Sequence, residues 1–116
     1  MTVLQSVTAG GAAGAPNELL DNNTKGVVGG VETQLLSVNL AQSRRIKLIT
    51  VSGEVMAEAG LYINTVQVQR LYMGAEKTLR FWLDIQYPAS TLIEVKVLHH
   101  RTDIAQAEFS GVVLGF

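Results

Sequence analysis

Cysteine is absent from this sequence of 116 residues, and its absence removes several classes of chemistry. Disulfide bonds, thiolate metal sites and cysteine nucleophiles all require a thiol, so none of them operates here. Charged residues are also scarce, at 16% of the chain, against about 25% in an average globular protein. Two explanations fit this shortage. Either uncharged polar side chains cover the surface, or another subunit does, since interface cores are depleted in charge.

A concentrated positive charge is missing as well. The formal net charge is −1, and the only adjacent basic residues are Arg44 and Arg45. Because nucleic-acid binding needs a basic patch that neutralises phosphates, we expect no nucleic-acid partner. No run approaches the roughly 18 apolar residues of a membrane span, so we expect no membrane partner. Residues 1–9 carry no basic side chain and do not resemble a signal peptide, which favours synthesis in the cytosol.

Alternation of apolar and polar residues dominates the rest of the chain. Leu79, Phe81, Leu83, Ile85 and Tyr87 are separated by polar or aromatic residues that would lie on the other face. A helix would scatter these side chains around its axis, whereas a strand places them on one side. The same period of two recurs in several segments after residue 32, and no window shows a helical stripe. These patterns predict an all-β protein.

Turn residues divide residues 32–116 into seven or eight short strands, the number and spacing expected of a β-sandwich. We therefore predict an antiparallel sandwich in this range, and both jelly-roll and immunoglobulin-like strand orders remain open. One strand departs from simple alternation, because the pattern that starts at Ile46 and Leu48 slips at Ile49. Such a slip predicts a β-bulge or a strand buried on both faces.

Residues 1–31 have a different character and are predicted to form an N-terminal arm and linker. Residues 10–16 are glycine, alanine and one proline, which favours an extended or flexible connector. We expect residues 17–21 to form one helical turn capped by Asn17, and residues 22–26 to form a turn. Gly29 and Gly30 predict a bend before the sandwich.

A search for chemical motifs identifies no catalytic residue, no cofactor site and no metal site. His99 and His100 are the only histidines, and neighbours on a strand point to opposite faces. Asp103 lies close in sequence, but one histidine and one aspartate fall short of the three or four ligands of a zinc site. The remaining metal hypothesis places one histidine from each subunit around a symmetry axis.

Three carboxylates, Glu54, Glu58 and Asp84, are candidates for a glycosidase pair, but nothing in the sequence brings them together. No serine lies in a nucleophile elbow, and the glycine-rich residues 10–14 lack the lysine of a phosphate-binding loop. We therefore expect a protein that is not an enzyme.

Trp82 lies on the polar face of the clearest predicted strand, between Arg80 and Asp84. Three interpretations are open. Loops or the N-terminal segment cover the indole, or it anchors a subunit interface, where tryptophan is enriched, or it stacks on a sugar ring. Tyr62 and Tyr72 are weaker candidates for the same roles.

The N-terminal segment carries apolar side chains, which disordered tails normally lack. We expect the arm to attach to a neighbouring subunit through four apolar residues, Val3, Leu4, Leu19 and Leu20. Together with Trp82, these four residues are the predicted protein-interface residues.

In overall build the chain resembles the accessory structural proteins of tailed-phage virions, such as capsid decoration (cement) proteins and small tail or fibre modules. The resemblance rests on residues 8–23 as an arm and residues 34–116 as a cysteine-free sandwich, and it involves no shared motif. It implies a homo-oligomer, often a trimer, that is fixed to a larger capsid or tail protein of the virion after assembly in the host cytoplasm. The sequence hypothesis is thus a structural assembly protein. A carbohydrate- or receptor-binding module of a tail or fibre is the alternative.

Overall fold

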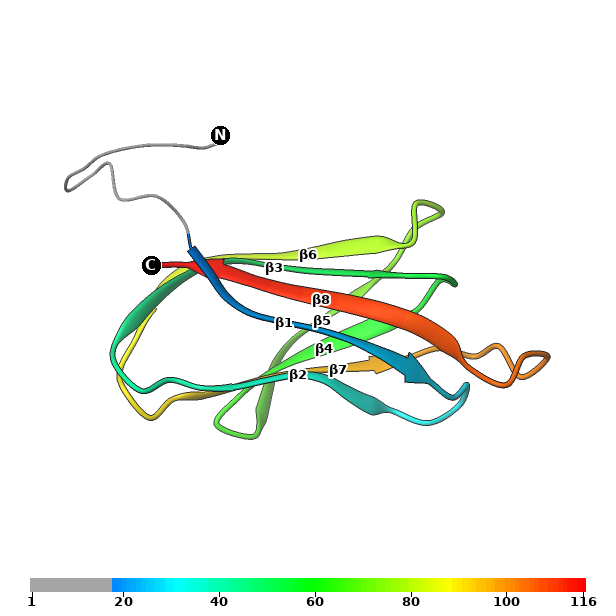
Figure 1. Cartoon of the computed structure of the whole chain (residues 1–116), viewed down its shortest axis with the longest axis horizontal. Helices are drawn as coiled ribbons and strands as arrows, with labels where there is room; N and C mark the ends of the chain where they lie inside the picture. Colours follow the sequence, from blue (N-terminus) through cyan, green and yellow to red (C-terminus); the bar gives the residue numbers. More distant parts are fainter. Residues whose placement is uncertain (1–17) are drawn as a thin grey trace.

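The computed structural model describes residues 18–116, and the regular secondary structure in that range consists of eight β-strands. Two antiparallel sheets of four strands form two layers (Figure 1). Sheet A contains, in order across the sheet, β1 (Glu18–Val27), β8 (Ala107–Gly115), β3 (Arg44–Gly53) and β6 (Thr78–Tyr87). Sheet B contains β2 (Thr33–Asn39), β7 (Leu92–Leu98), β4 (Glu58–Ile63) and β5 (Val66–Tyr72). The predicted all-β antiparallel sandwich is confirmed.

The strand pairing distinguishes between the two predicted strand orders. β1 pairs with β8, β2 with β7, β3 with β6 and β4 with β5, so the pairs are nested inside one another along the chain. Successive strands β1 and β2 belong to different sheets, whereas in an immunoglobulin domain the first two strands share a sheet. Eight strands in two sheets with this nested pairing form a jelly roll.

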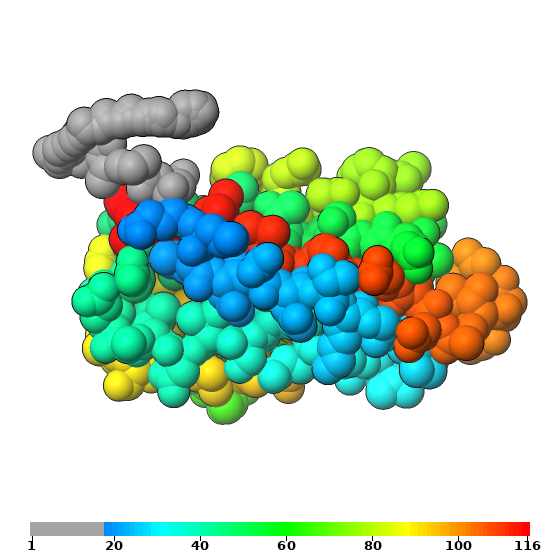
Figure 2. All heavy atoms as spheres, in the orientation of Figure 1, coloured from blue at the N-terminus to red at the C-terminus, as the bar shows by residue number. Residues whose placement is uncertain are grey.

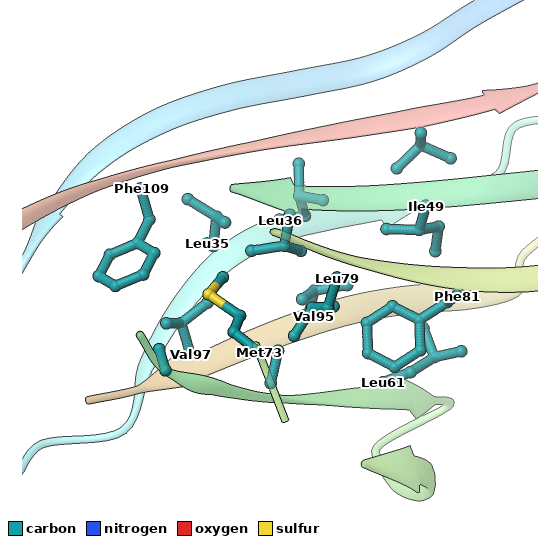
Figure 3. Close-up of a cluster of buried hydrophobic side chains, with 14 of the residues drawn as sticks. Leu35, Leu36, Ile49, Leu61, Met73, Leu79, Phe81, Val95, Val97 and Phe109 are labelled. Atoms are coloured by element: carbon teal, nitrogen blue, oxygen red, sulfur yellow. The ribbon is translucent and has the colours of Figure 1, made fainter. Parts of the chain in front are cut away.

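The core lies between the sheets, and His99 is the one polar residue among its largest fully buried side chains in residues 18–116. The rings of Phe81 and Phe109 lie at opposite ends of the cluster drawn in Figure 3, with aliphatic side chains from both sheets between them. β7 and β8 show why the sequence folds in this way. In both strands every second residue is buried, so one face of each strand is directed into the core.

β3 and β6 depart from regular alternation at the same place. Between Ile46 and Leu48 of β3 the register shifts, which confirms the bulge predicted from the slip in the pattern. On β6 the bulge includes Asp84, whose φ of 56° lies in the left-handed region that aspartate tolerates better than most residues. Leu79 and Phe81 are buried as predicted, but Ile85, beyond the bulge, is 43% exposed.

The segment before Val28 differs from the sequence expectation. Residues 18–27 form strand β1, which is paired with β8 along its length, so the predicted helical turn at 17–21 and the predicted turn at 22–26 are wrong. Their polar composition hides the strand, because β1 is an edge strand with most of its side chains in solvent. β1 therefore lies within residues 1–31, the range expected to be arm and linker. The bend predicted at Gly29 and Gly30 is confirmed.

The connections β1–β2, β3–β4, β5–β6 and β7–β8 all lie at one end of the sandwich, which we call the loop end (Figure 1, right). In the space-filling view the β7–β8 connection, in orange, projects beyond the body of the protein at this end (Figure 2). The start of β1 and the C-terminal Phe116 lie at the opposite end. The described residues contain no helix that could span a membrane.

His99 joins two of the connections at the loop end. Its side chain is fully buried, with Nε2 lying 2.7 Å from the carbonyl oxygen of Val27. The backbone N–H of Arg101 donates to Nδ1 at 3.2 Å, which assigns the ring proton to Nε2 as the donor to Val27. The backbone N–H of Gly30 also donates to the carbonyl of His99 at 2.7 Å. These bonds fix the β1–β2 turn against the β7–β8 connection.

Candidate functional site

The outer face of sheet A carries four apolar side chains in one cross-strand row. Leu19 of β1 lies opposite Leu114 of β8, Leu114 lies opposite Leu48 of β3, and Leu48 lies opposite Trp82 of β6. We call these four residues the apolar row. Its two ends are the most accessible part, since Leu19 is 58% exposed and Trp82 is 72% exposed. The row therefore crosses the whole sheet and reaches solvent at both edges.

The rows closer to the loop end are more polar. Asn22, Val112, Thr50 and Arg80 form the next row, and Val112 is its single apolar member. The row after that contains Thr24, Ser110, Ser52 and Thr78. In this row the hydroxyl groups of Thr24 and Ser110 lie 2.9 Å apart and share a hydrogen bond. The apolar surface is thus confined to the half of sheet A near the chain ends.

A cluster of charged side chains borders the apolar row beside Trp82. Arg45 Nε donates to Asp84 Oδ1 at 2.6 Å, and Lys47 Nζ donates to the same oxygen at 2.9 Å. The hydrogen bonds from Arg45 and then from Lys47 lower the pKa of Asp84 to about 2. Lys47 Nζ also lies 5.9 Å from the centre of the Phe116 ring. These contacts fix the bulge of β6 next to the indole.

The structure brings together two of the five predicted interface residues. Leu19 and Trp82 are the two ends of the apolar row, whereas Leu20 lies at the register shift of β1 and packs against the core. Val3 and Leu4 lie outside the described residues. Sequence reasoning missed Leu48 and Leu114, because only the strand register shows that they connect Leu19 to Trp82.

Trp82 is not covered by any loop within the described range, where most of its surface is accessible. Its cross-strand neighbour is a leucine, and the row continues with two more leucines. The leucines on one side of the indole suit a protein contact, whereas the charged cluster on the other side offers the hydrogen-bonding groups that a sugar needs beside a stacking ring, so both interpretations stay predictions.

The two histidines follow the end of β7 and do not lie in a strand, so the prediction from strand neighbours does not apply, although their surroundings differ. His99 is buried, and the side chain of His100 is 71% exposed. Within residues 18–116 there is no group of three or more His, Asp or Glu side chains able to hold a metal ion. Asp103 instead pairs with Arg101 through two hydrogen bonds of 2.7 Å.

The three candidate carboxylates have separate partners. Glu54 Oε1 accepts a hydrogen bond from the backbone N–H of Glu108 at 2.7 Å, and Glu58 is paired with Arg70 at 2.6 Å. Asp84 belongs to the charged cluster on β6 described above. Each carboxylate thus has a structural partner of its own, and no pairing among them is formed by these bonds.

No protein-family model and no curated protein matches this sequence. Among solved structures, the chain is similar to the insecticidal delta-endotoxin Cry8Ea1 from Bacillus thuringiensis, with 9% sequence identity and a TM-score of 0.49. The similarity covers 83% of this chain and 19% of the toxin chain, so the matched region is a small part of that protein.

Proposed function

We propose that this protein is a non-enzymatic structural protein that assembles with copies of itself through the outer face of sheet A. The observation that carries the proposal is the apolar row, which ends in an indole that is 72% exposed. The assembly we propose is part of a virion, as in capsid decoration (cement) proteins, with a larger capsid or tail protein as the second partner. The resemblance in build to phage accessory proteins supports this placement.

The energetics favour burial of the apolar row. Leaving a large aromatic side chain in water forgoes about 1.5–3 kcal/mol that its burial would contribute. Tryptophan is also among the residues that most often dominate interface energies when a partner covers them. Trp82 and Leu19 are both more than half exposed, so a partner that covered the row would bury both ends at once.

The size of the face argues that the arm takes part. Four strands about 4.8 Å apart, with nine or ten residues each, present on the order of 600 Å². Stable interfaces bury about 800 Å² per partner, so the face alone falls short. In the sequence, residues 1–17 come directly before Glu18, the first residue of β1, and Leu19 of the apolar row follows it. We propose that Val3 and Leu4 of this segment supply the remaining contact with the neighbouring copy.

The test compares the molar mass in solution of the parent protein and three variants, measured by analytical ultracentrifugation across a range of concentrations. The parent is expected to form a defined oligomer. Trp82→Asp and deletion of residues 1–17 are each expected to shift it toward the monomer. Val68→Asp is the matched control, because Val68 is 56% exposed but lies on β5 of the other sheet.

A parent protein that stays monomeric at every concentration would contradict self-assembly. An oligomer that dissociates in Val68→Asp but not in Trp82→Asp would place the interface on sheet B. Cosedimentation with purified capsids or tails then tests the second partner, and failure of the parent to bind either would contradict the virion assignment.

A further inference from the structure

An open cavity of about 600 Å³ lies at the loop end, away from the apolar row. Three connections form it: residues 54–57 between β3 and β4, residues 73–77 between β5 and β6, and residues 99–106 between β7 and β8. Figure 1 shows these connections converging at one end of the sandwich. Cavities that bind small molecules measure about 300–1,000 Å³ and combine apolar walls with a few polar groups. This cavity has the size for one ligand of that kind.

The lower part of the cavity is apolar. Val55, Ala57 and Met73 are each 8% exposed and belong to the core, so they form a fixed floor. Two other residues that line the cavity are accessible to solvent: Tyr72 is 71% exposed and Met56 is 56% exposed. An accessible tyrosine ring above an apolar floor is suited to stack against the apolar face of a flat or ring-shaped ligand.

A carboxylate on the cavity wall is held in a fixed position. Arg70 Nε and Nη2 both lie 2.6 Å from Glu58 Oε1, and Arg70 also pairs with Glu32 at 3.0 Å. The hydrogen bond from Arg70 lowers the pKa of Glu58, so this side chain is an ionised acceptor at neutral pH. Its second oxygen, Oε2, lies 3.4 Å from His100 Nε2, another group that lines the cavity. The carboxylate of Glu58 and the imidazole of His100, side by side, are suited to form hydrogen bonds with neighbouring hydroxyl groups of a sugar.

The cavity also contains a cation without a counter-ion. Arg101 is engaged by Asp103 at 2.7 Å, and the Arg70 charge is balanced by Glu58 and Glu32. Lys77 lines the cavity, and within residues 18–116 it forms no ion pair. Lys77 is solvent-exposed, and a ligand that carries a carboxylate would pair with its ammonium group.

We propose that this cavity binds an acidic sugar residue of the hexuronic acid type, as part of a glycan. The apolar face of the sugar ring stacks on Tyr72, its hydroxyl groups bond to Glu58 and His100, and its carboxylate pairs with Lys77. The site is separate from the apolar row, so it does not depend on the proposed self-assembly.

The test is a titration of the ¹⁵N-labelled full chain with methyl glycosides of hexuronic acids and of the matching neutral hexoses, at concentrations up to the millimolar range. Amide shifts in the ¹H–¹⁵N spectrum locate the site and give the affinity. We expect shifts concentrated in residues 55–58, 72–77 and 99–101, and tighter binding of the acidic glycosides. Absence of saturable shifts with every glycoside overturns the proposal.

Two variants and a control separate the contacts. Tyr72→Ala is expected to weaken binding of both kinds of glycoside by about fivefold, as expected for a lost stacking contact. Lys77→Gln is expected to remove the preference for acidic over neutral glycosides. Trp82→Ala, on the outer face of sheet A, is the control and should leave both affinities unchanged.

Three other outcomes would also overturn the proposal. A neutral hexose that binds more tightly than its uronic acid excludes the acidic class, as does a preference that survives in Lys77→Gln. Loss of binding in Trp82→Ala with retention in Tyr72→Ala places the sugar on sheet A instead. The spectrum of each variant without ligand shows whether its fold is retained.

Discussion

Leu48 of β3 and Trp82 of β6 are cross-strand partners on the outer face of sheet A, yet the indole remains 72% exposed. The contact between these two side chains therefore stabilises the fold by less free energy than a partner would gain by burying the indole. A cross-strand pair stabilises a sheet by about 0.2–1 kcal/mol. Interface tryptophans contribute more, because removal of a hot-spot side chain costs at least about 2 kcal/mol.

The first prediction concerns this difference. Trp82→Ala should lower the free energy of unfolding of the monomer by less than about 1 kcal/mol, while it weakens self-association by at least about thirtyfold. Urea denaturation at low protein concentration measures the first quantity, and sedimentation equilibrium measures the second. A variant that unfolds much more easily but associates normally would identify Trp82 as a part of the fold rather than of an interface.

The second prediction concerns buried His99. His99→Phe keeps an aromatic ring in place but removes the hydrogen bonds to the carbonyl of Val27 and from the N–H of Arg101. Loss of a partner for a buried polar group costs about 1–3 kcal/mol, so urea denaturation should show a loss of that size.

His100→Phe is the matched control for His99→Phe, because the His100 side chain is 71% exposed. It should change stability by no more than about 0.5 kcal/mol. Hydrogen exchange gives a second measure, since the amide of Gly30 donates to the His99 carbonyl and should exchange faster in His99→Phe. Equal effects of the two substitutions would contradict the role assigned to His99.

The third prediction concerns pH and Asp84. Hydrogen bonds from Arg45 and then Lys47 hold the pKa of Asp84 at about 2 in the folded protein, below the unfolded value of about 3.9. The folded state thus favours the ionised carboxylate. Its stabilising contribution is present above about pH 4 and is lost as the pH falls toward about 2.

Asp84→Asn tests this dependence, because asparagine also tolerates the left-handed backbone at this position. We expect the variant to be less stable than the parent at pH 7 and the difference to vanish as the pH falls below about 2. Asp103, whose pKa is also lowered to about 2, titrates in both proteins and cancels in the comparison. A stability difference that is independent of pH would show that the charge is not its cause.

The fourth prediction concerns close packing of the backbones of β8 and β3. A Cβ atom at Gly115 would lie 2.1 Å from the carbonyl oxygen of Arg45. The backbone of Arg45 cannot easily move away, because its N–H and carbonyl groups both form hydrogen bonds with the backbone of Phe116. Gly115→Ala should destabilise the protein by about 1–3 kcal/mol, the usual cost of overpacking. At Gly74 the nearest atoms belong to the flexible Glu76 side chain, so Gly74→Ala should have a smaller effect on the melting temperature.

Local patterns account for most of the fold that could be predicted from the sequence. Alternation in β7 and β8 matches their buried faces, and the slip near Ile49 corresponds to the bulge in β3. β1 escaped prediction because its polar sequence forms a strand only by pairing with β8, which is distant in the sequence. The bulge at Asp84 depends on a left-handed residue that alternation does not reveal.

The candidate site was predictable only in part, for the same reason. Trp82 and Leu19 stand out as apolar residues in polar segments, and the structure places both on one face. Their connection through Leu48 and Leu114 depends on the register of three strand pairs, and register is a property of the assembled sheet. The cavity at the loop end likewise depends on three connections that only the nested topology brings together.

The nesting of the strand pairs also sets the order in which the protein can form during synthesis. β1 pairs in sheet A with β8, so Glu18 must wait for Gly115 to leave the ribosome before its partner exists. Until then the hairpin of β4 and β5 is the one nested pair whose strands follow each other directly in the chain. Closing such long loops is entropically costly, and folding dominated by distant contacts takes roughly milliseconds to seconds. Sheet B can therefore form before sheet A, whose strands β1 and β3 stay unpaired on one edge until β8 is synthesised.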